Sequence, residues 1–127
     1  MEEFRFPLIS KSQQSVRQTL LTGENIMRML MNITFPHGEF NAAVKSGTAS
    51  RKIRMILEDA RPEAVYFIEQ NGQRTAVVII NVDDVSKIPS FAEPWFLTFN
   101  ASVEFRIAMT PADLEKAGLE ELGKKWS

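Results

Sequence analysis

The chain of 127 residues contains no cysteine and a single histidine, His37. The absence of cysteine excludes disulfides, thiol nucleophiles and thiolate metal sites, and it fits a reducing compartment without proving one. With one histidine and no carboxylate at ligand spacing beside it, we expect no metal site. The sequence also lacks a glycine-rich phosphate loop and a G-x-S-x-G nucleophile motif. No cofactor is therefore expected.

A strong charge of one sign and long apolar runs are also missing. The net charge of −1 gives no broad attraction to nucleic acid or to anionic membranes. No apolar run approaches the roughly 20 residues that span a bilayer, and the opening MEEFRFPLIS does not resemble a secretory signal. The short basic cluster of Arg51, Lys52 and Arg54 has no interleaved aromatic residues and is typical of a solvated helix face. We expect a cytoplasmic protein with no nucleic-acid or membrane partner.

The first 26 residues differ in character from the rest of the chain. The stretch SKSQQSVRQTLLTGEN is polar and has one weak helical pattern, which ends at Gly23. Two interpretations stay open: an N-terminal arm that packs on the domain or on a partner, and a loosely held extension. From Met27 onward, residues 27–127 have the size and composition of one compact domain.

Residue patterns in this domain predict an alternation of strands and helices. Strands are expected at about 27–35, 64–69, 74–82 and 101–110. The turn Asn71-Gly72 suits a two-residue type I′ hairpin, because both residues tolerate a positive φ. Helical spacing predicts a helix over about 40–60 with a break at Ser46-Gly47, and a second helix over about 86–99.

Proline and capping residues refine the helix ends. Ser86 is expected to cap the second helix, with Pro89 in its first turn, and Pro94 is expected to kink or split it. Thr110 as N-cap and Pro111 at the first position predict a further, C-terminal helix. The resulting β-α-β-β-α-β order, with an extra C-terminal helix, predicts an α+β, ferredoxin-like fold. Its four-stranded antiparallel sheet has the first and third strands at the centre.

The third expected strand raises the question of what covers both of its faces. Its run from Ala76 to Ile80 is apolar without interruption, whereas a strand covered on one face alternates apolar and polar residues. In the ferredoxin-like plan both helices lie on one face of the sheet, so the other face is bare in a monomer. We expect a second copy to cover it, in a two-fold homodimer with sheet against sheet. The alternatives are that the C-terminal helix or residues 1–26 fold across this face.

The energetic case for a homodimer is large in gross terms. An exposed aliphatic surface of several hundred Å² is unusual on a soluble monomer. Covering ~600 Å² per chain would contribute a gross gain of ~15 kcal/mol per chain. The costs of association reduce this figure heavily but leave its sign.

Three stretches carry a resemblance to a known group: ARPEAVYFIEQNGQR, IPSFAEPWFLTFNASVEF and MTPADLEKAGLEELGKKW. From Met27 the chain resembles the dimeric α+β barrel superfamily, and more closely a group of short uncharacterised bacterial proteins within it. The resemblance covers about 100 of the 127 residues and leaves out the N-terminal segment. It implies the fold and the dimer, and it implies no activity.

Some enzymes of this superfamily suggest residues to compare. In its cofactor-free and haem-degrading monooxygenases, an asparagine on the first strand, a tryptophan and a histidine form the working set. Asn32 falls on the first strand here, and Trp95 falls on the second helix. His37 lies before the first helix, which is not where those enzymes place their histidine. The resemblance therefore implies Asn32 and Trp95 as site candidates more directly than His37.

The residues themselves give each candidate two readings. His37, at a strand-to-helix junction, is either a general acid or base or a surface loop residue. Trp95 either lines a ligand pocket or belongs to the core. Tyr66 and Arg106 lie on strands, and Arg106 together with Glu104 could bind a polar ligand group or form a solvated strand face.

Two classes of function remain. The first is a small homodimeric protein that binds a small molecule or serves as an accessory protein, with no catalysis of its own. The second is a cofactor-independent monooxygenase or isomerase that acts on a small apolar or aromatic compound. In the second case we expect the site between the helices and the sheet, with His37 and Asn32 catalytic and Tyr66, Trp95 and Arg106 binding substrate. Fold-level analogy alone supports the enzyme.

Overall fold

The computed structural model describes residues 26–127, so the two interpretations of the N-terminal segment fall almost wholly outside the described residues. The described chain is an α+β domain built on a four-stranded antiparallel sheet with the strand order β2-β3-β1-β4. The first and third strands are central, as the sequence predicts. The strands are β1 (Met27–Thr34), β2 (Ala64–Gln70), β3 (Gln73–Val82) and β4 (Ser102–Ile107).

The hairpin between β2 and β3 sets the register of the outer half of the sheet. Asn71 and Gly72 both adopt a positive φ, of 54° and 77°, which confirms the predicted two-residue turn. The Glu69 carboxylate accepts a hydrogen bond from the Gly72 backbone N–H at 2.6 Å and closes the turn. With this register, Tyr66 pairs with Val77.

The helices follow the predicted order and differ in detail. The predicted break at Ser46-Gly47 separates α2 (His37–Lys45) from α3 (Ala49–Ala60), and Gly47 has a φ of 75°. A short 3-10 turn, η1 (Val85–Lys87), leads into α4 (Ile88–Phe99). Asp84 caps η1, because its carboxylate accepts from the Ser86 backbone N–H at 2.9 Å. The predicted Ser86 cap is wrong, since the N-cap of α4 is Lys87 and no side chain caps that helix. Pro94 lies inside α4 without splitting it.

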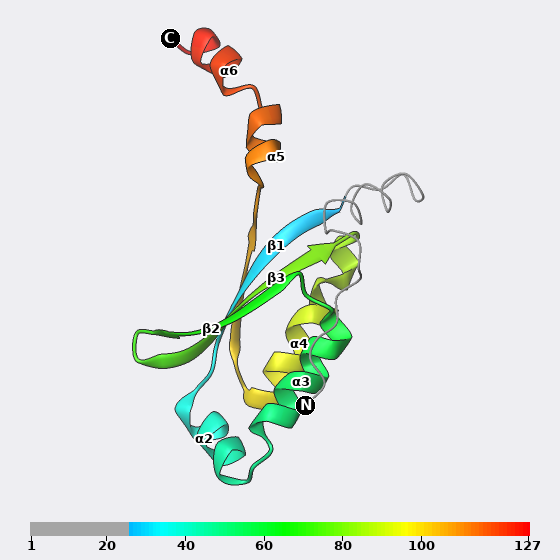
Figure 1. Ribbon diagram of the computed structural model, residues 1–127, viewed down its shortest axis with the longest axis vertical. Helices are drawn as coiled ribbons and strands as arrows, with labels where there is room; N and C mark the ends of the chain where they lie inside the picture. The colour runs from blue at the N-terminus through cyan, green and yellow to red at the C-terminus, as the bar shows by residue number, and fades with distance from the viewer. Residues whose placement is uncertain (1–25) are drawn as a thin grey trace.

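Helices α3 and α4 lie on one side of the sheet. Figure 1 shows the sheet nearly edge-on, with β2 toward the viewer and these helices on the right. Alternate residues of the two central strands face these helices and are buried, among them Met31, Ile33, Val78 and Ile80. Arg74 joins the sheet to α2. Its guanidinium lies 4.7 Å from the Phe40 ring centroid and donates to the Asn41 side chain at 2.8 Å.

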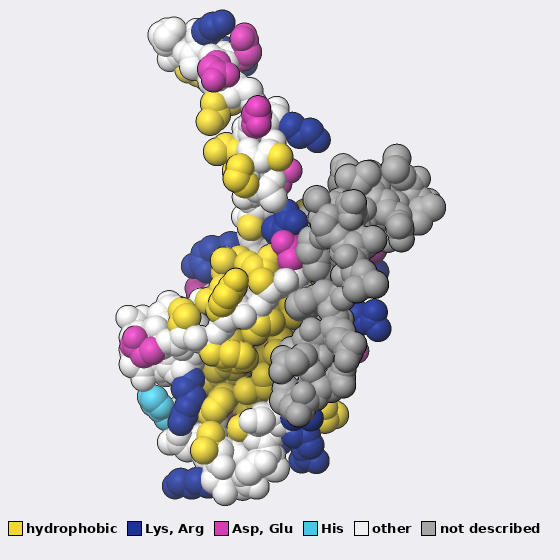
Figure 2. Space-filling model, viewed as in Figure 1, with side chains coloured by type: hydrophobic (Ala, Val, Ile, Leu, Met, Phe, Trp, Pro, Cys, Tyr) yellow, Lys and Arg dark blue, Asp and Glu magenta, His cyan; other side chains and the backbone are white. Residues whose placement is uncertain are grey.

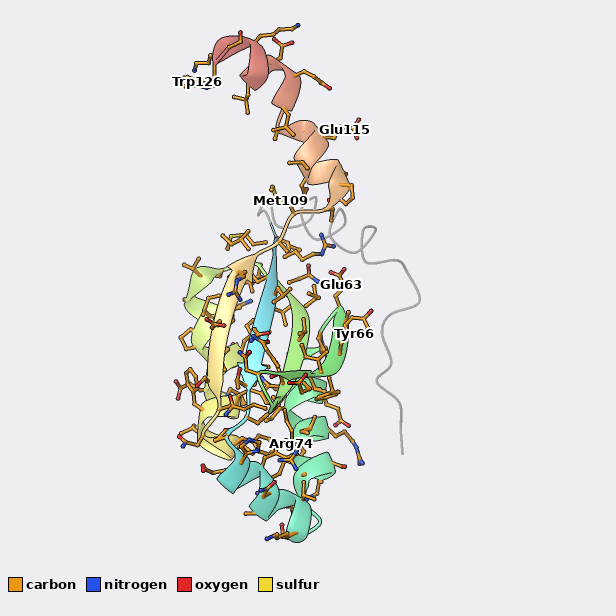
Figure 3. The ribbon with its side chains drawn as sticks, turned by 90° about the vertical axis from the view of Figure 1, so that its left-hand side faces the viewer. Glu63, Tyr66, Arg74, Met109, Glu115 and Trp126 are labelled. Atoms are coloured by element: carbon orange, nitrogen blue, oxygen red, sulfur yellow. The ribbon has the colours of Figure 1, made fainter. Side chains whose placement is uncertain are left out.

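The opposite side of the sheet is open. Figure 3 looks onto this face, where the four strands lie side by side and no described helix crosses them. The strand register places Leu30, Asn32, Val77 and Ile79 on it, because their neighbours in sequence face the helices. The bare face is therefore the Val77/Ile79 side of β3, a choice that the sequence left open.

The C-terminal segment corrects the expectation of one extra helix. Two short helices are present, α5 (Pro111–Lys116) and α6 (Leu119–Lys125), separated at Gly118, whose φ is 70°. They do not fold across the open face but extend away from the body beyond the end of β4 (Figure 1). None of the helices in residues 26–127 is long and apolar enough to cross a bilayer.

Candidate functional site on the open sheet face

The open face carries a band of apolar side chains that no described part of the chain covers. It runs across β1, β3 and β2, and we call it the apolar stripe: Leu30, Ala64, Tyr66, Ile68, Val77 and Ile79. Its central members are partly buried by their neighbours. At the β2 edge, Tyr66 is 64% exposed and Ile68 is 44% exposed. The stripe is the feature of this face that water solvates least well.

A polar cluster borders the stripe at one end. The Arg28 Nε donates to the Glu63 carboxylate at 2.9 Å, and the Asn81 side-chain amide donates to the same oxygen at 3.3 Å. Arg28 and Asn81 are directly opposite each other on β1 and β3, and Glu63 reaches them from the residue before β2. The cluster fixes the charges at this end of the face, so they are already paired within one chain.

A second polar group lies along β4. Glu104 and Arg106 are both exposed, and the distance of 3.8 Å between their charged groups marks a loose ion pair. Asn32 lies between Glu104 and Val77 in the register and is only 9% exposed. Its amide offers two donors and one acceptor oxygen, and the Arg106 guanidinium can bind a carboxylate with two parallel hydrogen bonds.

Three of the predicted site residues therefore share one face. Asn32 lies on β1, Arg106 on β4 and Tyr66 on β2. Tyr66 and Arg106 lie on opposite edge strands, which at the usual strand spacing are roughly 14 Å apart. Within one chain, a single small ligand could contact Asn32 together with either Arg106 or Tyr66.

Trp95 lies on the other side of the sheet, in the core. Its side chain is 1% exposed and packs edge-on against Phe35, with ring centroids 5.8 Å apart. Phe99, one helical turn further along α4, stacks at 6.4 Å from it. Trp95 is therefore a core residue, and the sheet separates it from Asn32 and Tyr66. The site expected between helices and sheet is not assembled from these residues.

His37 is the first residue of α2 and is exposed. As the single histidine of the chain, it is visible on the surface of the body in Figure 2. It lies beyond the end of β1, outside the four strands that carry Asn32, Tyr66 and Arg106. The structure therefore does not group His37 with these three residues on the open face.

Two carboxyl groups at the starts of helical segments, Asp84 and Asp113, have a lowered pKa. The Ser86 backbone N–H beside Asp84 lowers the pKa of that carboxyl, and the Thr110 backbone N–H does the same for the pKa of Asp113. Both carboxylates cap a helix or turn, so their lowered pKa follows from local structure. Residues 26–127 bring together no group of three or more His, Asp or Glu side chains that could hold a metal ion.

Two features of the site were not found from the sequence. The first is Glu63, which directly precedes the strand expected at 64–69 and accepts hydrogen bonds from both Arg28 and Asn81. The sequence signal was Arg28 among the apolar residues of β1, which needs a carboxylate partner when half-buried. The second feature is the exposure of the apolar residues that follow β4, which depends on where the C-terminal segment goes.

Comparison of the chain with protein-family models, with curated proteins and with solved structures finds no significant match.

Proposed function

We propose that the chain is a ferredoxin-like binding protein that dimerises through its open sheet face, as in a dimeric α+β barrel, and holds a small molecule between the two sheets. The observation that supports this proposal most directly is the uncovered apolar stripe, which has Asn32 and Arg106 beside it on the same face. Stacked sheets lie about 10 Å apart, which leaves space for side chains and, where these are small or polar, for a ligand.

The physical reason for the dimer is the apolar stripe itself. Tyr66 and Ile68 expose apolar surface at the β2 edge, and Leu30, Val77 and Ile79 continue it to the centre of the sheet. A second copy presents the same stripe, so a two-fold stack removes both from water. The polar cluster of Arg28, Glu63 and Asn81 is already internally paired and can border such an interface without an unpaired charge.

The chemistry of the face favours a flat apolar or aromatic molecule with an anionic or carbonyl group. The apolar stripe supplies the contact for its apolar part. Arg106 supplies a bidentate donor for a carboxylate, and the Asn32 amide adds a nearly buried donor. Turnover would also need an acid or base at the ligand. His37 lies outside this face, and Glu104, the carboxylate beside Asn32, is exposed and pairs loosely with Arg106. The geometry therefore supports binding better than a monooxygenase or isomerase reaction.

Light scattering after size exclusion tests the dimer, on the full chain and on a chain that starts at Met27. We expect a dimer for both. Tyr66→Lys and Ile79→Lys should give monomers, because each places a charge inside the stacked faces. Leu97→Lys is the matched control on α4, where Leu97 is 81% exposed and faces away from the sheet. A monomeric wild type, or a dimer only with residues 1–26 present, would contradict the proposal.

The ligand site can be probed with 8-anilinonaphthalene-1-sulfonate, an aromatic anion whose fluorescence rises in apolar surroundings. We expect saturable binding to the dimer and about tenfold weaker binding after Arg106→Gln, because one charge-assisted contact is lost. Arg51→Gln removes a guanidinium from exposed α3 surface and should leave binding unchanged. If both variants bind the dye with equal affinity, Arg106 does not belong to the ligand site.

A further inference from the structure

The C-terminal arm, which we define as residues 108–127, exposes an unusual amount of apolar surface. Neither α5 nor α6 contains a buried residue. The large apolar side chains of the arm are all exposed: Met109 63%, Leu114 42%, Leu119 56%, Leu122 44% and Trp126 77%. In Figure 3 the arm continues upward from the sheet, with Met109 at its base and Trp126 near its tip.

The apolar side chains at the tip of the arm lie on one side of α6. Leu119, Leu122 and Trp126 follow each other at spacings of three and four residues, which places them on one helical face. The rest of that helix consists of Gly123 and charged residues, and Lys124 pairs with Glu121 at 3.4 Å. An amphipathic helix of this kind is built to lie against an apolar surface.

The arm needs such a surface to remain helical. Isolated helices shorter than about 12 residues are marginal in water, and α5 and α6 have 6 and 7 residues. A capping box at Thr110 and Asp113 supports the start of α5, but it does not cover any apolar area. The described body of the same chain provides no cover, because the arm extends away from it (Figure 1).

The charges of the arm favour a protein surface over a membrane. Residues 108–127 contain four carboxylate side chains and three lysines, so the arm has no net positive charge to attract anionic lipids. In the body of the domain, the edge strand β2 exposes apolar side chains on both of its faces. Tyr66 and Ile68 belong to the apolar stripe, whereas Phe67, which is 56% exposed, pairs with the buried Ala76 and faces the helix-covered side.

We propose that the arm of each copy packs against the β2 edge of a second copy, with Leu119, Leu122 and Trp126 against Phe67. This inference rests on the proposed dimer and specifies how its edges are closed. If the two-fold axis of the stacked sheets runs along the strands, β2 of one copy lies over β4 of the other. The arm that continues from β4 then begins level with Ala64, at the start of the partner's β2. To reach Phe67 it turns back along that strand at residues 108–110.

Length and area agree with this placement. An arm of 20 residues with helical rise spans roughly 30 Å, which exceeds the roughly 23 Å of the seven-residue strand β2. At about half exposure, its five large apolar side chains offer on the order of 500 Å². Two reciprocal arms and the surfaces that receive them would bury on the order of 2,000 Å², which is within the range of stable dimers. The contact also covers an edge strand that has neither proline nor lysine to protect it.

The first test replaces the apolar face of the arm in the full chain by L119Q/L122Q/W126Q. Glutamine keeps helix propensity and charge while removing the apolar contact. We expect the dissociation constant of the dimer, measured by analytical ultracentrifugation, to rise on the order of 100-fold. The matched control E121K/K124E exchanges the ion pair on the opposite face and should leave the constant unchanged.

The outcomes separate this inference from the proposed dimer. A wild-type monomer contradicts both. A dimer that tolerates L119Q/L122Q/W126Q but not Tyr66→Lys retains the sheet-face dimer and overturns the arm contact. A dimer lost with the arm variant and unaffected by Ile79→Lys overturns sheet stacking, and with it the placement of the arm that is argued from stacked sheets.

Cysteine cross-linking then locates the contact, since the chain has no cysteine of its own. A Phe67→Cys chain mixed with a Leu122→Cys chain should form a disulfide-linked mixed dimer under mild oxidation. Leu97→Cys mixed with Leu122→Cys is the control and should give little mixed product. Equal yields for the two mixtures would show that the arm does not select β2.

Discussion

The residues of the aromatic core show how local contacts support the open face from behind. Phe99 is fully buried and touches the rings of Phe35 and Phe40, with centroids 5.3 Å away in both cases. Phe35 follows β1 directly, and its backbone N–H donates to the Arg74 carbonyl at 3.0 Å. The cluster thus holds α2, α4 and the end of the two central strands together. Asn32, three residues before Phe35, lies on the same strand and is paired on both sides, with Val77 and Glu104.

Phe99→Ala should lower the free energy of unfolding by about 3–5 kcal/mol, because it removes a ring from a fully packed site. Leu97→Ala, two residues earlier on the exposed side of α4, should change it by less than about 0.5 kcal/mol. Urea denaturation followed by circular dichroism gives both values. Similar losses for the two variants would contradict the assignment of Phe99 to the core.

A second comparison at this scale uses two glycines. A Cβ added to Gly72 meets no atom within 4 Å, so only its φ of +77° opposes alanine there. Gly38 lies in α2 with equally open surroundings and no positive φ. We expect Gly72→Ala to destabilise the protein by about 1 kcal/mol and Gly38→Ala to stabilise it by about 0.5 kcal/mol. Thermal unfolding of the two variants should therefore shift in opposite directions.

At the scale of elements, most strand and helix positions could be predicted from the sequence. Asn71-Gly72 specified its turn, and the Ser46-Gly47 break specified the division of the first helix, because both depend on local backbone preferences. The face of β3 that stays bare could not be predicted. Val77 and Val78 are chemically alike, and only the register with β1 assigns Val78 to the core.

Long-range packing also explains where the site prediction differed. The alternation of apolar and polar residues from Ser102 to Met109 predicts that Ile107 faces inward with Val103 and Phe105. Ile107 is 69% exposed because it is the last residue of β4, beyond the cover of α4. Trp95 and Asn32 both looked like pocket residues, yet the sheet passes between them. A sequence gives the period of an element but not the layer that it faces.

The start of α5 yields a prediction about pH. Asp113 accepts from the Thr110 backbone N–H at 2.9 Å, which lowers the pKa of the carboxyl. Because the pKa is lower in the folded arm than in an unfolded one, this contribution to helix stability is fully present above the ordinary aspartate pKa. It is lost as the pH falls through the lowered value. NMR carbon shifts of residues 110–116 should therefore lose helical character in acid.

The control for this titration is Asp113→Asn, which has no carboxyl group to protonate. We expect its arm to show no acid-dependent change in the same resonances. The titration of Asp84 has the same direction at the start of η1, so signals near Ser86 serve as an internal comparison. An acid transition in the arm that persists in Asp113→Asn would assign it to another group.

At the scale of the whole molecule, the two sides of the sheet differ in how well their apolar side chains are covered. The helix-covered side of the sheet is a continuous core, whereas the open face and the C-terminal arm leave apolar side chains exposed. Figure 2 shows apolar side chains along the arm. In the proposed dimer, another copy of the same chain covers both the open face and the arm. A dimer that uses them has a folded state whose population depends on the total protein concentration.

Thermal and urea unfolding should therefore depend on protein concentration. For a dimer that unfolds to monomers, 100-fold dilution lowers the apparent free energy of unfolding by about 2.7 kcal/mol. Tyr66→Lys should remove this dependence, because a monomer unfolds with a concentration-independent midpoint, while Leu97→Lys should retain it. A wild-type midpoint that stays constant over that dilution would mean that folding is complete within one chain. The apolar stripe would then be a surface for a different partner.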